Sequence, residues 1–190
     1  MEETMEQSRT EIKITGFGGQ GVILAAYIIG KAAALFDKKE ATLTQSFGPE
    51  ARGGACSAQM VISNSKVLYP YVKRPQILVC LSQEAYNKFE PELISGGLLI
   101  IEKDLVKPKP AENGIQLLAI PATRIAEELG RRMVLNIVTV GFFTAVADVV
   151  GEEAVRGAIK DSVPKGTEDL NLKAFERGFQ YGKNLREHGE

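Results

Sequence analysis

The amino-acid sequence predicts an α/β fold of three layers (α/β/α), in which a central, mostly parallel β-sheet lies between layers of helices. Two observations carry this prediction. Strand patterns alternate with helical patterns over residues 12–121, and the pattern from residue 122 onward is mostly helical. No repeat or domain boundary interrupts residues 12–187, which we expect to form a single domain. Residues 1–11 are acidic and polar and are expected to form a flexible tail.

Several segments carry the pattern of β-strands. The first, "IKITGFGG", alternates in polarity and then ends in glycines, whereas "ILVCLS" is an uninterrupted apolar run, as expected of a strand buried on both faces. Between the second and third strands, "PEARGGA" is predicted to be a loop because proline and paired glycines break regular structure. The predicted strands cover residues 12–19, 40–48, 56–63, 77–82, 96–102 and 115–122.

The remaining regular segments are predicted helices, which make the C-terminal part of the chain helical. Over residues 22–36 apolar side chains occupy most of the helix circumference, so this helix is expected to lie against the sheet and to be covered on its other side. Near the end, Thr167 is the expected N-cap of a long helix, with Glu168 and Asp169 in its first turn. The predicted helices cover residues 22–36, 83–93, 122–130, 136–151, 151–163 and 167–187.

The composition argues against several classes of function. Charge is nearly balanced, with 23 basic and 24 acidic residues, and basic pairs such as Lys73–Arg74 are expected at the surface, not in a nucleic-acid track. The single histidine, His188, is expected to be solvated, so histidine-based catalysis and a histidine metal site are not expected. Cys56 and Cys80 are too few to hold an iron–sulfur cluster and are expected to be buried thiols. With no signal peptide and no apolar run of membrane-spanning length, the protein is expected to be cytoplasmic.

A glycine-rich turn joins the first predicted strand to the first predicted helix. Gly16, Gly18 and Gly21 match the pattern G-x-G-x-x-G, with Gly19 and Gln20 between them, which predicts a Rossmann-like first β-α unit. In such a unit the first glycine permits a tight turn, the second lets the main chain approach a phosphate, and the third lets the helix pack closely. The N–H groups at the start of the helix then face an anion. The pattern by itself supports a phosphate-bearing ligand and a ligand-free junction about equally.

Binding of NAD at this turn would need a carboxylate about 20 residues further on, at the end of the second strand. That end carries Thr44, Gln45 and Ser46, whereas Glu40 stands at the opposite end of the strand. NAD is therefore poorly supported. A P-loop is excluded because no Gly-Lys-Ser/Thr follows the glycines.

The loop "QSFGPEARGGAC" is the second candidate site. It is expected to emerge at the same edge of the sheet as the glycine turn. Arg52 can form two parallel hydrogen bonds to a phosphate or carboxylate. Gly53 and Gly54 let another backbone or a phosphate come close. Ser46 lies at the start of this stretch, and Glu50 can pair with Arg52 or reach a partner chain. The alternative is a flexible surface loop with a solvated ion pair.

No catalytic nucleophile with its base can be assembled from the sequence. The residues therefore predict a binding or assembly module, with no catalytic residues and no metal ligands. Two alternatives stay open: a stand-alone nucleotide-binding reductase of the NAD type, which would lack a Tyr–Lys or His pair to move protons, and a homo-oligomeric binding module.

Four stretches in order resemble the gamma subunit of 2-oxoacid:ferredoxin oxidoreductases, the pyruvate/ketoisovalerate oxidoreductase gamma family. They are "GFGGQGVILAA", "TQSFGPEARGGACSAQMVIS", "ILVCLSQEAYNKF" and "VPKGTEDLNLKAFERGF". The resemblance covers residues 12–181. The form "SFGPEARGG" is most similar to the 2-oxoglutarate enzymes of the family.

The resemblance implies a multi-subunit enzyme that oxidatively decarboxylates a 2-oxoacid, here 2-oxoglutarate, to an acyl-CoA, here succinyl-CoA, and passes electrons to ferredoxin. Thiamine diphosphate, magnesium and [4Fe-4S] clusters would belong to the alpha, beta and ferredoxin-like subunits. This chain would dock on the thiamine-binding subunits, would be inactive when isolated, and would then tend to self-associate through the surface meant for its partner.

The resemblance also suggests a ligand for the glycine turn. CoA carries a pyrophosphate and a 3′-phosphate and needs no carboxylate on its ribose hydroxyls. We therefore expect the main-chain N–H groups of residues 16–21 to bind one phosphate and Arg52 to bind another.

Overall fold

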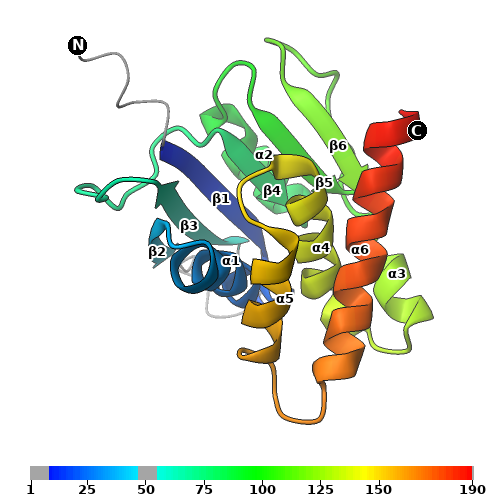
Figure 1. Ribbon diagram of the computed structural model, residues 1–190. Helices are drawn as coiled ribbons and strands as arrows, with labels where there is room; N and C mark the ends of the chain where they lie inside the picture. Colours follow the sequence, from blue (N-terminus) through cyan, green and yellow to red (C-terminus); the bar gives the residue numbers. More distant parts are fainter. Residues whose placement is uncertain (1–8, 47–54, 190) are drawn as a thin grey trace.

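The computed structural model describes residues 9–46 and 55–189, and within these residues the strands form one twisted six-stranded sheet (Figure 1). The strand order is β2-β3-β1-β4-β5-β6. β1, β4, β5 and β6 run parallel to one another, whereas β3 runs antiparallel to both of its neighbours, β1 and β2. The strands are β1 (Arg9–Phe17), β2 (Glu40–Ser46), β3 (Ala55–Ser63), β4 (Ile77–Cys80), β5 (Leu98–Glu102) and β6 (Gln116–Ile120).

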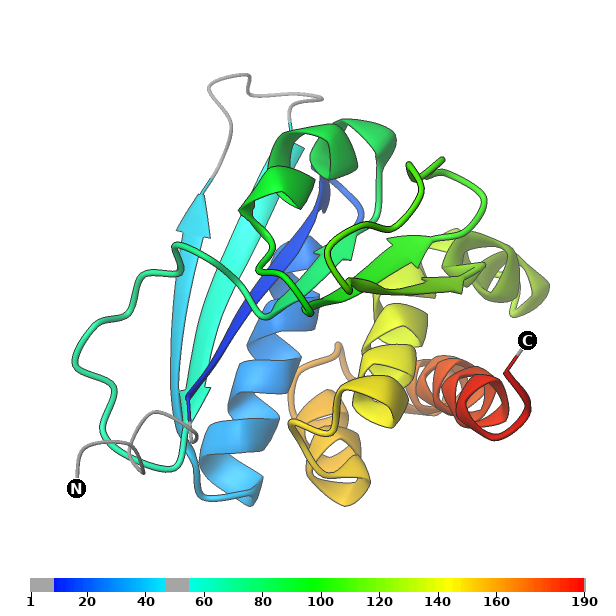
Figure 2. The same ribbon diagram turned by 90° about the horizontal axis from the view of Figure 1, so that it is seen from above.

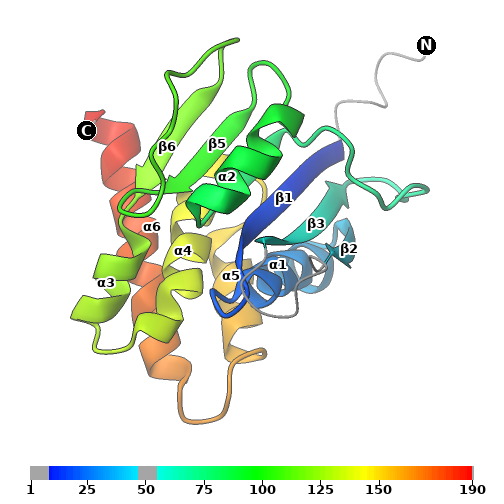
Figure 3. The same ribbon diagram turned by 180° about the vertical axis from the view of Figure 1, so that it is seen from behind.

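Helices cover both faces of the sheet, but unequally. α1, α4, α5 and α6 lie on one face, and α2 lies on the other face against the middle of the sheet (Figures 2 and 3). The three-layer architecture and the helical C-terminal part predicted from the sequence are confirmed. The α-helices are α1 (Val22–Lys31), α2 (Gln83–Phe89), α3 (Ala122–Glu128), α4 (Leu135–Ala147), α5 (Glu152–Lys160) and α6 (Glu168–His188), and the short turns are η2 (Ala32–Phe36), η3 (Glu90–Glu92) and η4 (Arg132–Val134).

The hydrophobic core is correspondingly divided by the sheet. The larger cluster joins α1, α4, α5 and α6 to the sheet and contains Ile14, Ile29, Phe142 and Phe175, all nearly or fully buried. The smaller cluster lies under α2 and includes Tyr86 and side chains of β4 and β5. β4 contributes to both clusters, as its uninterrupted apolar sequence predicted.

The position of β3 is the main feature that the alternation pattern did not reveal. β3 pairs with β1 along its whole length and separates β1 from β2. Residues 47–54 are too few for the crossover of a dozen or more residues that parallel neighbours need, so β2 and β3 are necessarily antiparallel. The first β-α unit is Rossmann-like, but the second strand of the chain does not lie beside the first.

Several local features differ from expectation. Residues 9–11, assigned to the tail from the sequence, are the first residues of β1 and pair with β3; residues 1–8 lie outside the described residues. The helix predicted over residues 22–36 ends in a π-helical turn, η2. Thr167 holds the N-cap position of α6, but its hydroxyl donates to the carbonyl of Pro164 at 2.7 Å and does not cap the helix.

No helix in the described part of the chain combines the length and apolar character needed to cross a bilayer.

Candidate functional site at the glycine turn

The glycine turn lies where the path of the chain changes face. α1 follows β1 on one face of the sheet, whereas α2 follows β4, the parallel neighbour of β1, on the opposite face (Figures 1 and 3). In open α/β sheets, ligands bind in the crevice at the carboxyl ends of strands where such a switch occurs. The topology therefore places residues 17–21 at the position where a ligand is expected.

The side chain of Gln20 closes the turn. Its Oε1 accepts the N–H of Phe17 at 2.7 Å, and its Nε2 donates to the carbonyl of Leu81, just past β4, at 2.8 Å. The main-chain N–H of Gln20 also donates to the carbonyl of Phe17 at 3.2 Å. One amide side chain thus ties the end of β1 to the residue after β4.

The glycines of the motif serve different purposes. Gly16 lies within β1, and a Cβ there would come within 2.5 Å of Gln20 Oε1 and 3.1 Å of Leu81 Cβ, so Gly16 provides the space for the Gln20 amide. Gly19 and Gly21 have φ values of 95° and 71°, a backbone region that side chains strongly disfavour. Gly18 faces open space, since no described atom lies within 4 Å of the place that a Cβ would take.

The N-terminus of α1 presents main-chain donors at this edge. Gly21 is its N-cap residue, no described side chain caps the helix, and its first turn has no acidic residue. Because no described side chain caps it, the start of the helix keeps a partial positive charge that attracts anions. Nearby, Asn136 at the start of α4 donates from Nδ2 to the carbonyl of Gly21 at 3.4 Å.

The second candidate loop begins and ends at this same edge, as expected from the sequence. Ser46 is the last residue of β2 and pairs with Ser57, while Ala55, the first residue of β3, pairs with Phe17 beside the glycine turn. The loop residues proposed as candidates, Glu50, Arg52, Gly53 and Gly54, lie outside the described residues.

Asn136 is the site residue that the sequence reasoning missed. Its side chain is nearly buried, and a Cβ on Gly21 would approach its Cγ to 2.7 Å, so the turn and the start of α4 are closely packed. A signal was present, because Asn136 is an amide at the head of the mostly apolar stretch 136–147. A buried amide of this kind needs a hydrogen-bond partner, and Gly21 provides it.

The two cysteines are placed as inert thiols. Both are free and buried. Burial raises the pKa of Cys80 from its ordinary 9.0 to about 12, against a smaller lowering by the Thr15 hydroxyl, and burial also raises the pKa of Cys56. A nucleophilic thiolate needs the opposite shift. Among the described residues no group of three or more His, Cys, Asp or Glu is arranged to hold a metal ion.

Known proteins that are similar to this chain match it over nearly its whole length. The family model described as pyruvate ferredoxin/flavodoxin oxidoreductase matches residues 11–181. The 2-oxoglutarate synthase subunit KorC of Methanocaldococcus jannaschii is 48% identical over 187 residues, which cover 97% of this chain and all of KorC. The keto/oxoacid ferredoxin oxidoreductase gamma subunit of Geobacter sulfurreducens has a crystal structure with a TM-score of 0.83 and 38% identity, over 92% of this chain and 96% of that one.

A longer chain contains the same fold as one of its parts. The 2-oxoglutarate:ferredoxin oxidoreductase from Magnetococcus marinus, solved with 2-oxoglutarate, coenzyme A and succinyl-CoA, matches 94% of this chain but only 32% of its own chain, with a TM-score of 0.84 and 22% identity. At this identity the likeness concerns the fold alone. The family model and the relatives at higher identity cover nearly the entire sequence, and the chain therefore belongs to the pyruvate ferredoxin/flavodoxin oxidoreductase family.

Proposed function

We propose that this chain is the non-catalytic gamma subunit of a 2-oxoglutarate:ferredoxin oxidoreductase, an enzyme that forms succinyl-CoA and passes electrons to ferredoxin. The observation that carries the proposal is the likeness, from end to end, to a subunit of 2-oxoglutarate synthase. A stand-alone NAD-dependent reductase is not favoured. The end of β2 has no carboxylate, and β3 separates that strand from the glycine turn.

We assign the cofactors of such an enzyme to the other subunits. Two buried cysteines with raised pKa values cannot supply the four thiolates of an iron–sulfur cluster. The role proposed for this chain is to dock on the alpha and beta subunits that hold thiamine diphosphate and magnesium, next to the ferredoxin-like subunit with its [4Fe-4S] clusters. The proposed location of the assembled enzyme is the cytoplasm.

We further propose that the glycine turn binds a phosphate group of CoA. The uncapped start of α1 offers main-chain N–H groups, Gly18 leaves room for a close approach, and Gln20 fixes the turn. Arg52, in the sequence between β2 and β3, would bind a second phosphate. The proposal rests on the chemistry of the turn, because the relative that contains CoA supports only the fold.

Two measurements test the proposal. Co-expression with the alpha and beta subunits should give a stable complex that reduces ferredoxin with 2-oxoglutarate and CoA, and failure of any complex to form would remove the subunit assignment. In that complex, Arg52→Ala should raise the KM for CoA by about tenfold, the effect of one lost charge-assisted contact of about 1.4 kcal/mol. Arg177→Ala, which changes an exposed arginine on α6, serves as the control. An unchanged KM for CoA in Arg52→Ala would contradict the phosphate role.

A further inference from the structure

The segment 64–76, which joins β3 to β4, presents a cluster of exposed apolar side chains. Leu68 is 84% exposed, Tyr69 45% and Tyr71 57%, and the two tyrosine rings contact each other edge to face, with centroids 5.5 Å apart. These three residues form what we call the apolar patch. Solvent-facing groups of large apolar side chains mark interaction surfaces, whereas single exposed ones need no explanation.

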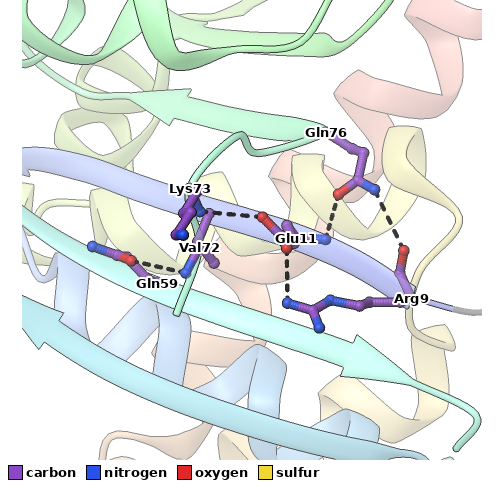
Figure 4. Close-up of polar contacts among 6 residues, drawn as sticks. All are labelled: Arg9, Glu11, Gln59, Val72, Lys73 and Gln76. Atoms are coloured by element: carbon purple, nitrogen blue, oxygen red, sulfur yellow. Dashed lines mark hydrogen bonds and ion pairs between the residues drawn. The ribbon is translucent and has the colours of Figure 1, made fainter. Parts of the chain in front are cut away.

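Residues 72–76, which directly follow the patch, are held on the sheet by hydrogen bonds (Figure 4). The N–H of Val72 donates to Oε1 of Gln59 on β3 at 3.2 Å, and the N–H of Lys73 donates to Oε2 of Glu11 on β1 at 3.3 Å. The N–H of Gln76 donates to the carbonyl of Glu11 at 2.9 Å, and Val72 is buried. The part of the segment that follows the patch is therefore anchored to β1 and β3.

The anchoring has a consequence for binding. The segment contains no helix or strand, and connections longer than about 12 residues without such structure are usually functional. Pro70, between the two tyrosines, restricts the main chain further. Large aromatic side chains on a pre-ordered backbone lose little conformational entropy on binding, and such residues supply most of the binding energy in protein interfaces.

Three cationic side chains of the same segment, which we call the cationic rim, accompany the patch. Lys66, Lys73 and Arg74 are exposed, and none of them forms an ion pair with a described residue. The Lys73 ammonium lies 5.6 Å from the centre of the Tyr69 ring. Segment 64–76 itself contains no acidic residue and is net positive, and the neighbouring Glu11 carboxylate on β1 is paired with Arg9.

We propose that the apolar patch is the docking surface for another subunit of the oxidoreductase, one that presents an apolar pocket bordered by Asp and Glu side chains. This inference rests on the proposed function. Charge decides between this partner and a second copy of the chain, because a two-fold pairing of the patch with itself would bring two cationic rims together. An acidic border on a different chain complements the rim instead.

The position of the patch is compatible with ligand binding at the glycine turn. Segment 64–76 follows Ser63, which pairs with Arg9 at the start of β1, whereas the glycine turn follows Phe17 at the other end of the same strand. A partner on the apolar patch therefore contacts the opposite edge of the sheet and leaves the crevice at the glycine turn open.

The test measures binding of purified variants to the alpha–beta complex of the same enzyme, for example by biolayer interferometry. Leu68→Ser combined with Tyr71→Ser should raise the dissociation constant by at least about tenfold. Met133→Ser is the matched control, because Met133 is 83% exposed on a different surface. Lys73→Glu combined with Arg74→Glu should weaken binding and flatten its dependence on salt, whereas Lys109→Glu, at another exposed lysine, should not.

The possible outcomes separate the two proposals. If the wild-type chain does not bind the alpha–beta complex, the proposed function fails. If the wild-type chain binds and the patch variants bind equally well, the docking surface is wrong while the function stands. If the patch variants instead abolish a homodimer seen by light scattering and leave binding to alpha–beta unchanged, the occupant is a second copy and the inference is overturned. Unchanged thermal unfolding of the variants establishes that a loss of binding is not a loss of fold.

Discussion

Gly18 and Gly21 belong to the same sequence pattern, but their surroundings differ. Gly21 has φ of 71° and lies against Asn136, whereas Gly18 has an ordinary φ and faces open space. Conformation and contact, not the pattern, decide which glycine the fold requires. A motif match alone treats the two residues as equivalent.

We therefore expect Gly21→Ala to lower the free energy of unfolding by about 2 kcal/mol or more, through the left-handed backbone and the overlap with Asn136. Gly18→Ala should change it by less than about 0.5 kcal/mol. Urea denaturation of both variants checks the prediction. Equal losses would show that the conformations of the two glycines are not as described.

Cys80 illustrates a titrating group whose burial affects stability. Its pKa is about 12 in the folded protein against 9.0 for an ordinary thiol, mainly because burial disfavours the thiolate. Because the pKa of Cys80 is higher in the folded than in the unfolded protein, the stability that this thiol contributes is fully present below pH 9.0. It is lost as the pH rises towards 12.

Between pH 8 and pH 10.5, the wild type should therefore lose more stability than Cys80→Ala, with an additional slope of up to about 1.4 kcal/mol per pH unit above the unfolded pKa. Urea denaturation under reducing conditions at both pH values measures the difference. Parallel losses in the two proteins would contradict the raised pKa.

Among the secondary-structure elements, α4 and α6 approach each other closely because both have glycine at the crossing. A Cβ on Gly178 of α6 would lie 2.8 Å from the main-chain carbon of Val138, and one on Gly141 of α4 would lie 2.8 Å from the main-chain nitrogen of Phe179. Main-chain atoms cannot move aside as a side chain can. The larger layer of helices therefore depends on these two glycines.

Gly178→Ala should destabilise the protein by about 3 kcal/mol, because the helices must separate to admit a methyl group. Gly30→Ala in α1 is the matched control. Its Cβ would have Met60 Sδ as nearest neighbour at 3.7 Å, an ordinary contact, and alanine favours a helix over glycine by about 1 kcal/mol. Thermal unfolding should show opposite shifts, and a stable Gly178→Ala variant would rule out the close crossing.

At the scale of the whole molecule, the described residues carry two proposed binding surfaces and neither a reactive thiol nor a metal-ligand group. The thiols are buried with raised pKa values, and no metal-ligand group occurs in the described ranges. The two surfaces of interest, the glycine turn and the apolar patch, lie at opposite edges of the sheet. This arrangement is what we expect of a subunit that binds a ligand at one edge of the sheet and a catalytic partner subunit at the other.

We expect the isolated chain to be inactive with 2-oxoglutarate, CoA, thiamine diphosphate, magnesium and a viologen dye. Addition of the alpha and beta subunits should restore dye reduction. The assay is the rate of viologen colour formation in the absence of oxygen. Turnover by the isolated, metal-free chain would refute the non-catalytic role.

The sequence by itself determined the elements and their class, because hydrophobic periodicity and glycine placement act over a few neighbouring residues. The strand after residue 11, the buried character of β4 and the long final helix were all predicted in this way, as was the edge of the sheet where the loop after Ser46 emerges. Only the tertiary structure decided that β3 lies between β1 and β2, that Gln20 and Asn136 complete the glycine turn, and that segment 64–76 is anchored with its aromatic side chains exposed. These features depend on contacts between residues far apart in the chain, which leave no period in the sequence and form only when the sheet is assembled.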